Sequence, residues 1–215
     1  MPTDLLGWGL VLGATLSLCY LTLFCWRGDS WLKTGVKTGA VALPAIGLIS
    51  LQMPLLPLAG LWACVLGDFL LSRPGDRALR AGIAAFALGH VLYVVAFWLQ
   101  FSPSLFADQL ALVLPLLLVL LGLTTERWLM PRTGDLRPAV RIYVLLILLM
   151  GCLAAQQPIP RDTILLGALA FILSDLLLSL QLFVTNRGLF GRLAPFAVWF
   201  FYYAAQVLII AGFIL

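Results

Sequence analysis

The sequence predicts an all-α membrane protein, a polytopic bundle of eight transmembrane helices. Of its 215 residues, 63% are hydrophobic and 10% are charged, which is too apolar for a water-soluble domain of this length. Charged residues, prolines and glycines divide the chain into eight apolar runs, each close to the roughly 20 residues that a helix needs to cross a bilayer. Basic residues gather in every second connection between these runs, as in multi-pass membrane proteins.

The first run follows Asp4 and ends at Arg27. Because it has no basic residue before its apolar core and no convincing cleavage site, we interpret it as a permanent helix rather than a secretory signal. Each later run is bounded by a charged residue, a proline or a glycine. The eight expected spans are residues 5–26, 36–51, 55–72, 79–100, 109–128, 139–155, 163–184 and 193–215.

The basic residues divide unevenly between the seven connections, and only Arg161 lies in an even-numbered one. By the positive-inside rule, the odd-numbered connections are cytoplasmic and both termini are non-cytoplasmic, as in a protein of the bacterial inner membrane or a cytoplasm-facing equivalent. A basic cytoplasmic rim accounts for the net charge of +4, so we expect membrane lipids and no nucleic acid as partners. The odd-numbered connections and their edges carry Arg27, Lys33, Lys37, Arg73, Arg77, Arg80, Arg127, Arg132, Arg137, Arg141, Arg187 and Arg192.

An internal repeat relates the third and seventh runs. Residues 63–72 and 170–179 share the pattern A-x-x-L-[G/S]-D-x-L-L-S, which places Asp68 and Asp175 at equivalent positions. A coincident aspartate is informative because an ionisable group in the bilayer is costly. We therefore expect one transmembrane domain, 1–215, with two four-helix repeats, 1–105 and 106–215. Four helices per repeat make the repeats parallel, related by an axis along the membrane normal.

The two aspartates are the strongest candidates for function. Asp68 comes five residues before Arg73, about 7.5 Å inside the cytoplasmic boundary at 1.5 Å per residue. The repeat gives Asp175 the same depth, so we expect the two carboxyl groups to face each other.

Polar side chains also follow each aspartate on the next helix. His90 and Tyr93 lie three residues apart on one face of the fourth run. The eighth run carries Trp199, Tyr202, Tyr203 and Gln206. Buried polar groups need hydrogen-bond partners, and the aspartates are candidates. The structural alternative is a histidine that only bridges helices and aromatic rings that only pack.

The basic residues near the aspartates have two interpretations. Lys37 either extends its ammonium group to the membrane surface or directs it at an anionic group of a substrate. The same alternatives apply to Arg73, Arg77 and Arg80. The sequence has no GxSxG, HExxH, P-loop or GxGxxG signature, and with one histidine a zinc site would need both aspartates. We expect no metal and no other cofactor.

These residues, in this order and spacing, resemble the YhhN-type membrane proteins, the lysoplasmalogenase family, over nearly the whole chain. The matching residues are Lys37, Gly67-Asp68, Gly89-His90, Tyr93, Ser174-Asp175 and Tyr202-Tyr203-x-x-Gln206. In that family the lysine is usually followed by proline, whereas Thr38 follows it here. The resemblance implies a lysophospholipid substrate whose vinyl ether bond is hydrolysed to a fatty aldehyde and a glycerophospho-ethanolamine or glycerophospho-choline.

A vinyl ether is cleaved when its β-carbon is protonated and water attacks the resulting oxocarbenium ion, a logic close to that of glycosidase carboxylate pairs. The resemblance therefore implies that Asp68 and Asp175 are the catalytic acid and base and share one proton. It implies substrate-binding roles for Lys37, His90, Tyr93, Ser174, Trp199, Tyr202, Tyr203 and Gln206.

Two other functions are open. Paired carboxylates in a duplicated bundle also describe a proton-coupled transporter of a small or amphiphilic solute, which helices broken at the aspartates would favour. A non-catalytic lipid-binding scaffold would be favoured by aspartates that are ion-paired with basic residues. The sequence also leaves open which aspartate is the acid.

Overall fold

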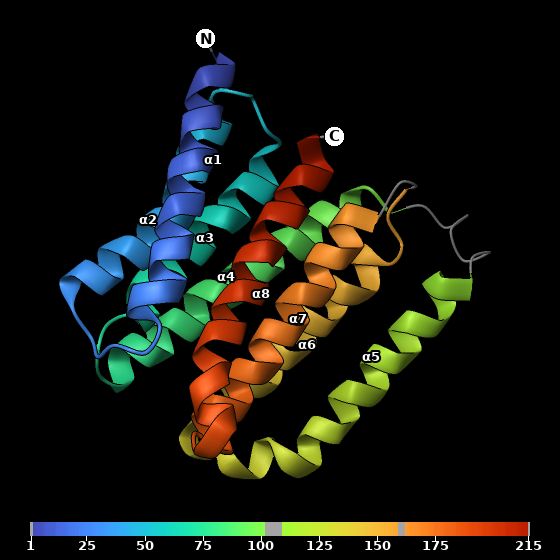
Figure 1. Cartoon of the computed structure of the whole chain (residues 1–215). Coiled ribbons are helices and arrows are strands. Elements are labelled where there is room, and N and C mark those ends of the chain that lie inside the picture. The colour runs from blue at the N-terminus through green and yellow to red at the C-terminus, as the bar shows by residue number, and fades with distance from the viewer. Residues whose placement is uncertain (1, 102–108, 159–161, 215) are drawn as a thin grey trace. The chain divides into compact units, whose positions relative to one another are not determined.

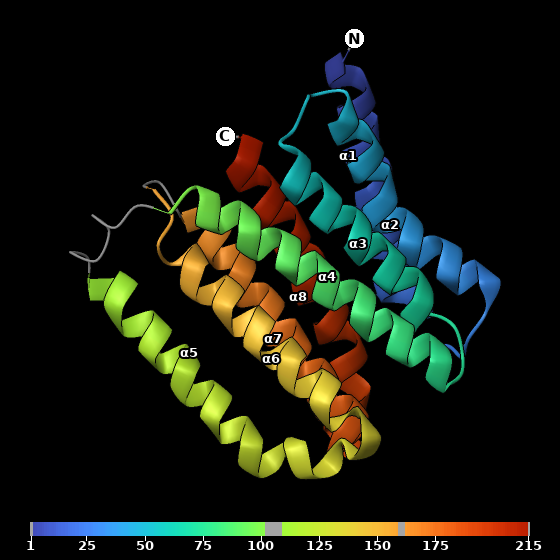
Figure 2. The same ribbon diagram turned by 180° about the vertical axis from the view of Figure 1, so that it is seen from behind.

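The computed structural model describes residues 2–101, 109–158 and 162–214, and within them the chain folds into eight α-helices without a strand (Figures 1 and 2). Arg161, Leu215 and the expected repeat boundary at 105/106 lie outside these residues. Seven of the helices are long and apolar enough to cross a membrane, and α3, with 17 residues, is shorter. The helices are α1 Pro2–Cys19, α2 Trp31–Ile49, α3 Leu55–Leu71, α4 Asp76–Leu99, α5 Gln109–Trp128, α6 Arg137–Ala154, α7 Asp162–Phe183 and α8 Gly188–Ile214.

The all-α class is confirmed, but several helices begin earlier than the apolar runs. Helix α2 begins at Trp31 rather than at residue 36 because the Ser30 side chain accepts a hydrogen bond from the Lys33 amide at 3.1 Å and caps the helix. Helix α8 begins at Gly188, whose φ of 61° suits glycine. The expected spans begin after charged residues because hydropathy falls there, whereas the helices begin before those residues.

Residues up to Leu92 and residues from Tyr93 onward form two compact units. In the first unit, α1 packs on α2, α2 on α3, and α3 on the first part of α4. The blue ribbons of α1 and α2 run side by side in both views (Figures 1 and 2). Helix α1 approaches α2 closely at Gly13, where an added Cβ would lie 2.7 Å from the Ala40 carbonyl oxygen and 2.6 Å from the Pro44 ring.

This contact makes Gly13 a test of the α1–α2 packing. We expect Gly13→Ala to lower the free energy of unfolding by about 1–3 kcal/mol, because the new methyl group overlaps backbone and proline ring atoms that cannot move aside cheaply. Gly7→Ala on the same helix is the matched control, since nothing lies within 4 Å of its added Cβ. Thermal unfolding in detergent should separate the two variants, and equal midpoints would contradict the packing.

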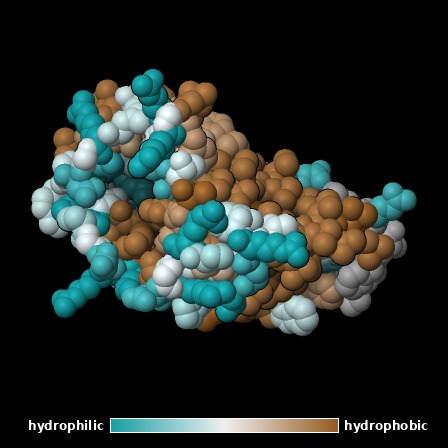
Figure 3. Space-filling view, turned by 90° about the horizontal axis from the view of Figure 1, so that it is seen from below, coloured by the Kyte–Doolittle hydropathy of each residue, from teal (hydrophilic) through white to brown (hydrophobic). Residues whose placement is uncertain are grey.

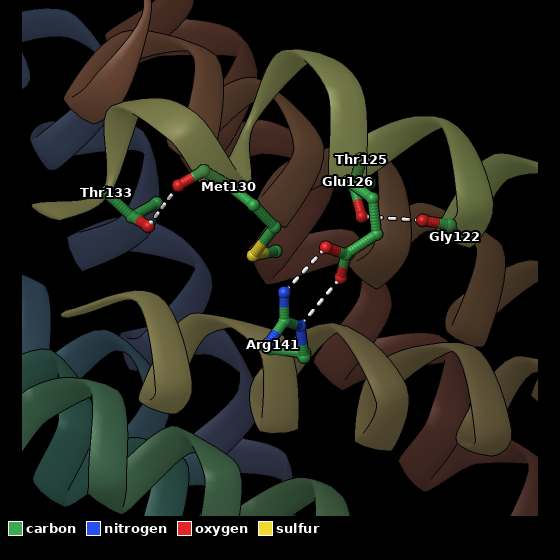
Figure 4. A network of polar contacts seen from close by, with 6 residues as sticks. All are labelled: Gly122, Thr125, Glu126, Met130, Thr133 and Arg141. Atoms are coloured by element: carbon green, nitrogen blue, oxygen red, sulfur yellow. Dashed lines mark hydrogen bonds and ion pairs between the residues drawn. The ribbon is translucent and has the colours of Figure 1, made fainter.

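In the second unit, α5 packs on α6, α6 on α7, and α7 on α8. Figure 4 shows the α5–α6 connection, where Arg141 holds Glu126 through two hydrogen bonds of 2.7 Å. Both side chains of this ion pair are exposed, so it contributes little to stability. Buried Leu129, Met130 and Val140 form the apolar cluster of the same connection.

Apolar side chains also cover the outside of the helices. Leu145 on α6 is 63% exposed and Leu166 on α7 is 56% exposed, a pattern that suits contact with lipid rather than with water. The α1–α2 and α3–α4 connections lie at one end of the first unit, because successive helices alternate in direction (Figure 1). Figure 3 is a space-filling view from below Figure 1, and hydrophilic residues gather on part of the surface that it shows, beside large hydrophobic areas.

Candidate functional site

Asp68 forms an ion pair with Lys37 inside the first unit. The Lys37 Nζ lies 3.1 Å from Asp68 Oδ1, and the two side chains are 15% and 1% exposed. Lys37 comes from α2 and Asp68 from α3, which pack against each other. A carboxylate this deeply buried needs a compensating charge, and the ammonium supplies it. Lys37 therefore directs its ammonium group at Asp68 and not at the membrane surface.

Asp175 accepts a hydrogen bond from Tyr143 inside the second unit. The Tyr143 hydroxyl lies 2.7 Å from Asp175 Oδ2, and both side chains are partly buried. Next to the aspartate, Ser174 donates to the Val198 carbonyl at 2.9 Å and fixes α7 against α8. The Ser174 hydroxyl group is thus hydrogen-bonded to the backbone of α8.

Tyr143 is absent from the residues that the sequence predicts for the site. In each unit the aspartate lies on the third helix and contacts a polar residue of the second helix, Lys37 in one unit and Tyr143 in the other. The contacting residues are 31 positions apart in the first unit and 32 in the second. The two aspartates are 107 positions apart, and this offset carries Lys37 to Val144, so extending the repeat to the preceding helix would have led to the neighbour of Tyr143.

His90 lies deeper in the first unit than Asp68. Helices α3 and α4 run antiparallel, with Gly67 against Phe86 and Cys64 against Gly89. This register puts Asp68 level with residue 85, so His90 is five residues further along α4, about 7.5 Å at 1.5 Å per residue. His90 is fully buried.

The aromatic residues of α8 also extend away from Asp175. Since Ser174 lies opposite Val198, Trp199 is level with the aspartate and Tyr202 is about one turn deeper, where its ring meets Phe171 edge-on. Trp199 and Tyr203 stack with ring centroids 6.1 Å apart. These rings form a band along α8.

Gln206 and Tyr93 form a separate polar pair in the second unit. The Tyr93 hydroxyl donates to Gln206 Oε1 at 2.7 Å, and both side chains are buried. Since Val198 lies opposite Ser174, Gln206 is eight residues further along α8, about 12 Å beyond the level of Ser174. Tyr93 also stacks on Phe97, which stacks on Phe213. Sequence predicts these polar residues on the right helices, but the register separates them in depth.

The two carboxyl groups differ chemically in their immediate partners. An ammonium group beside Asp68 favours the ionised carboxylate, whereas a phenol beside Asp175 can donate to a carboxylate without fixing its charge. Asp68 and Asp175 belong to different units, so their facing each other stays a prediction. Among the described residues, no group of three or more His, Cys, Asp or Glu side chains is arranged to hold a metal ion.

An apolar helical exterior, with a buried aspartate in the first unit and a partly buried one in the second, defines an integral membrane protein with intramembrane polar sites. The YhhN family model matches residues 40–213, and the chain belongs to the YhhN family. Proteins named lysoplasmalogenase from Mycobacterium bovis and Mycobacterium tuberculosis are 29% identical over 153 residues, which are 68% of this chain and 56% of theirs. A protein from Escherichia coli named uncharacterized membrane protein YhhN is 32% identical over 144 residues, 64% of this chain and 65% of that protein.

The chain thus spans little more than half the length of the mycobacterial relatives. No solved structure matches it. The family membership and the relatives' names agree with the predicted family and with the predicted membrane location.

Proposed function

We propose that this protein hydrolyses the vinyl ether bond of lysoplasmenyl phospholipids and releases a fatty aldehyde and a glycerophospho-ethanolamine or glycerophospho-choline. The observation that carries the proposal is the different setting of the two aspartates, with Lys37 at Asp68 and Tyr143 at Asp175. An acid and a base that work together need such different environments. The name of the mycobacterial relatives supports the same reaction.

In the proposed architecture all eight helices span the membrane as two parallel four-helix repeats. The 17 residues of α3 extend about 25 Å at 1.5 Å per residue, near the lower limit for a span. The matching contacts between second and third helix in the two units support the duplication. The odd-numbered connections then face the cytoplasm, and both termini face the other side.

In the proposed reaction Asp175 is the acid. Because Lys37 keeps Asp68 ionised, the proton for the β-carbon of the vinyl ether comes from the other carboxyl group. The Tyr143 hydroxyl then donates a hydrogen bond to the Asp175 carboxylate that forms when the proton is transferred. The ionised Asp68 steadies the oxocarbenium ion and takes a proton from the attacking water, so the hemiacetal that forms collapses to an aldehyde and the free glycerol hydroxyl.

The deeper residues then contact the hydrocarbon chain rather than the ether bond. His90 is about 7.5 Å beyond Asp68, and Gln206 is about 12 Å beyond the level of Ser174, as the helix registers give. Tyr202 and Tyr203 lie about one turn beyond Trp199 on α8, and Trp199 lies at the level of the ether. In this proposal the residues set chain orientation, and the chemistry needs no metal or organic cofactor.

The test is aldehyde release from 1-alkenyl lysophosphatidylethanolamine by the purified protein in detergent. We expect stoichiometric aldehyde and glycerophosphoethanolamine, and no aldehyde from the 1-acyl lipid. No release from any alkenyl lipid would overturn the proposal.

Tyr143 gives a more specific expectation for the mechanism. We expect Tyr143→Phe to lower kcat about tenfold with little change in KM, because one hydrogen bond to the newly formed carboxylate is lost. Full activity, with kcat and KM both unchanged, would remove Tyr143 from the mechanism.

A second candidate function is a lipid-binding scaffold, because the Lys37–Asp68 ion pair is the feature that this alternative predicts. It differs from the hydrolase in requiring no aldehyde release. A transporter is less well supported, since α3 and α7 continue unbroken through Asp68 and Asp175.

A further inference from the structure

Arg73 is held in a fixed position at the end of α3. Its Nη1 donates to Thr34 Oγ1 at 3.0 Å, and its guanidinium carbon lies 3.9 Å from the centroid of the Trp31 ring. Thr34 is itself 2% exposed and donates to the carbonyl oxygens of Ser30 and Ser72. An arginine at a membrane surface normally moves freely, so two anchors on one guanidinium restrict a side chain whose planar fork suits phosphate.

Arg73 also belongs to a ladder that leads to Asp68. From the end of α3 inward, the α2 and α3 residues meet as Trp31 with Arg73, Thr34 with Ser72, and Lys37 with Asp68. Five residues separate Arg73 from Asp68, about 7.5 Å along the axis at 1.5 Å per residue. In a 1-alkenyl lysophospholipid, seven bonds join the phosphorus to the β-carbon, a comparable extended length. The ladder matches the distance between the charged group of this lipid and the carbon that is protonated.

We propose that Arg73, positioned by Trp31 and Thr34, binds the phosphodiester of a single-chain lysophospholipid and sets the vinyl ether at the level of Asp68. This inference rests on the proposed hydrolase function. Arg77 and Arg80 share the connection but are exposed at the surface, and they contribute only to the general positive potential. Because the guanidinium that lies over the Trp31 ring is the charged group of this site, the group that it recognises is the phosphate.

The test measures binding rather than turnover. The probes are 1-O-alkyl lysophosphatidylethanolamine, which has no vinyl ether to cleave, 1-O-alkylglycerol, which lacks the phosphate, and inorganic phosphate. Arg73→Gln is compared with Arg77→Gln as the matched control. We expect Arg73→Gln to weaken binding of the lysophospholipid at least about tenfold, the effect of losing a hydrogen bond from a charged group. Binding of alkylglycerol, and all binding by Arg77→Gln, should change less than about twofold.

Arg73→Lys keeps the charge but loses the fork, and its affinity should fall between those of the wild type and Arg73→Gln. Equal losses for the phospholipid and for alkylglycerol would show a structural role and overturn the proposal. Equal losses of affinity in Arg73→Gln and Arg77→Gln would show that a general positive surface potential, and not a site at Arg73, binds the lipid, and would overturn the proposal. Inorganic phosphate binding as tightly as the lipid would assign the site to a free anion. Because none of the probes is cleaved, these results are distinct from a failure of hydrolysis.

Discussion

Replacing Asp175 with asparagine is expected to reduce aldehyde release at least about 100-fold, because the substrate carbon then has no acid to protonate it. Asparagine has nearly the same volume and can still accept a hydrogen bond from Tyr143, so the α6–α7 contact should survive. The measurement is kcat with 1-alkenyl lysophosphatidylethanolamine, together with the thermal midpoint in detergent. The loss should appear in kcat without a matching loss of stability.

Asp162→Asn is the matched control for this prediction. Asp162 lies in the first turn of the same helix, is exposed, and has no part in the proposed chemistry. Its replacement should leave kcat unchanged within about twofold. If Asp175→Asn retained full activity, Asp175 could not be the acid.

Replacing Lys37 with methionine is expected to lower the free energy of unfolding by about 3–5 kcal/mol, the usual effect of leaving one partner of a buried ion pair without its counter-charge. The side-chain volume hardly changes, so the loss of stability comes from the unpaired Asp68 carboxylate, which is 1% exposed, and not from a cavity. Chemical or thermal unfolding in a single detergent provides the measurement.

The double variant Lys37→Met with Asp68→Asn separates stability from activity. Removing both charges should recover most of the lost stability, since no unpaired charge is left in the interior. Aldehyde release should stay low, because the carboxylate that activates water is gone. Recovered stability with recovered activity would show a catalyst that does not use Asp68 and would contradict the assigned role of this carboxylate.

The helices were predictable because membrane spans depend on length and hydropathy, which the sequence states directly. The first five residues of α2 were missed because Lys33 was assigned to the connection before the apolar run, although the Ser30 cap was present as a signal. Helix α3 was expected over residues 55–72, and it ends one residue earlier, at Leu71.

The site was only partly predictable because hydropathy and spacing identify a face of one helix but not its register with the next. Lys37 and Asp68 were both singled out, yet their contact depends on how α2 packs against α3. The sequence pattern also did not predict the Tyr93–Gln206 hydrogen bond. Its position about 12 Å from the level of Ser174 follows only from the α7–α8 register. Tyr143 reads as one aromatic residue among many in a membrane helix, so composition gave no reason to select it.

The central claim is that a carboxyl group protonates the β-carbon of a vinyl ether. It is tested most directly by running the reaction of the wild-type protein in D₂O and analysing the aldehyde by mass spectrometry. Protonation by an acid in exchange with solvent places one deuterium on the carbon next to the aldehyde group, and the accompanying glycerophospholipid headgroup gains none on carbon. An aldehyde without that deuterium, or no aldehyde at all, would contradict the mechanism.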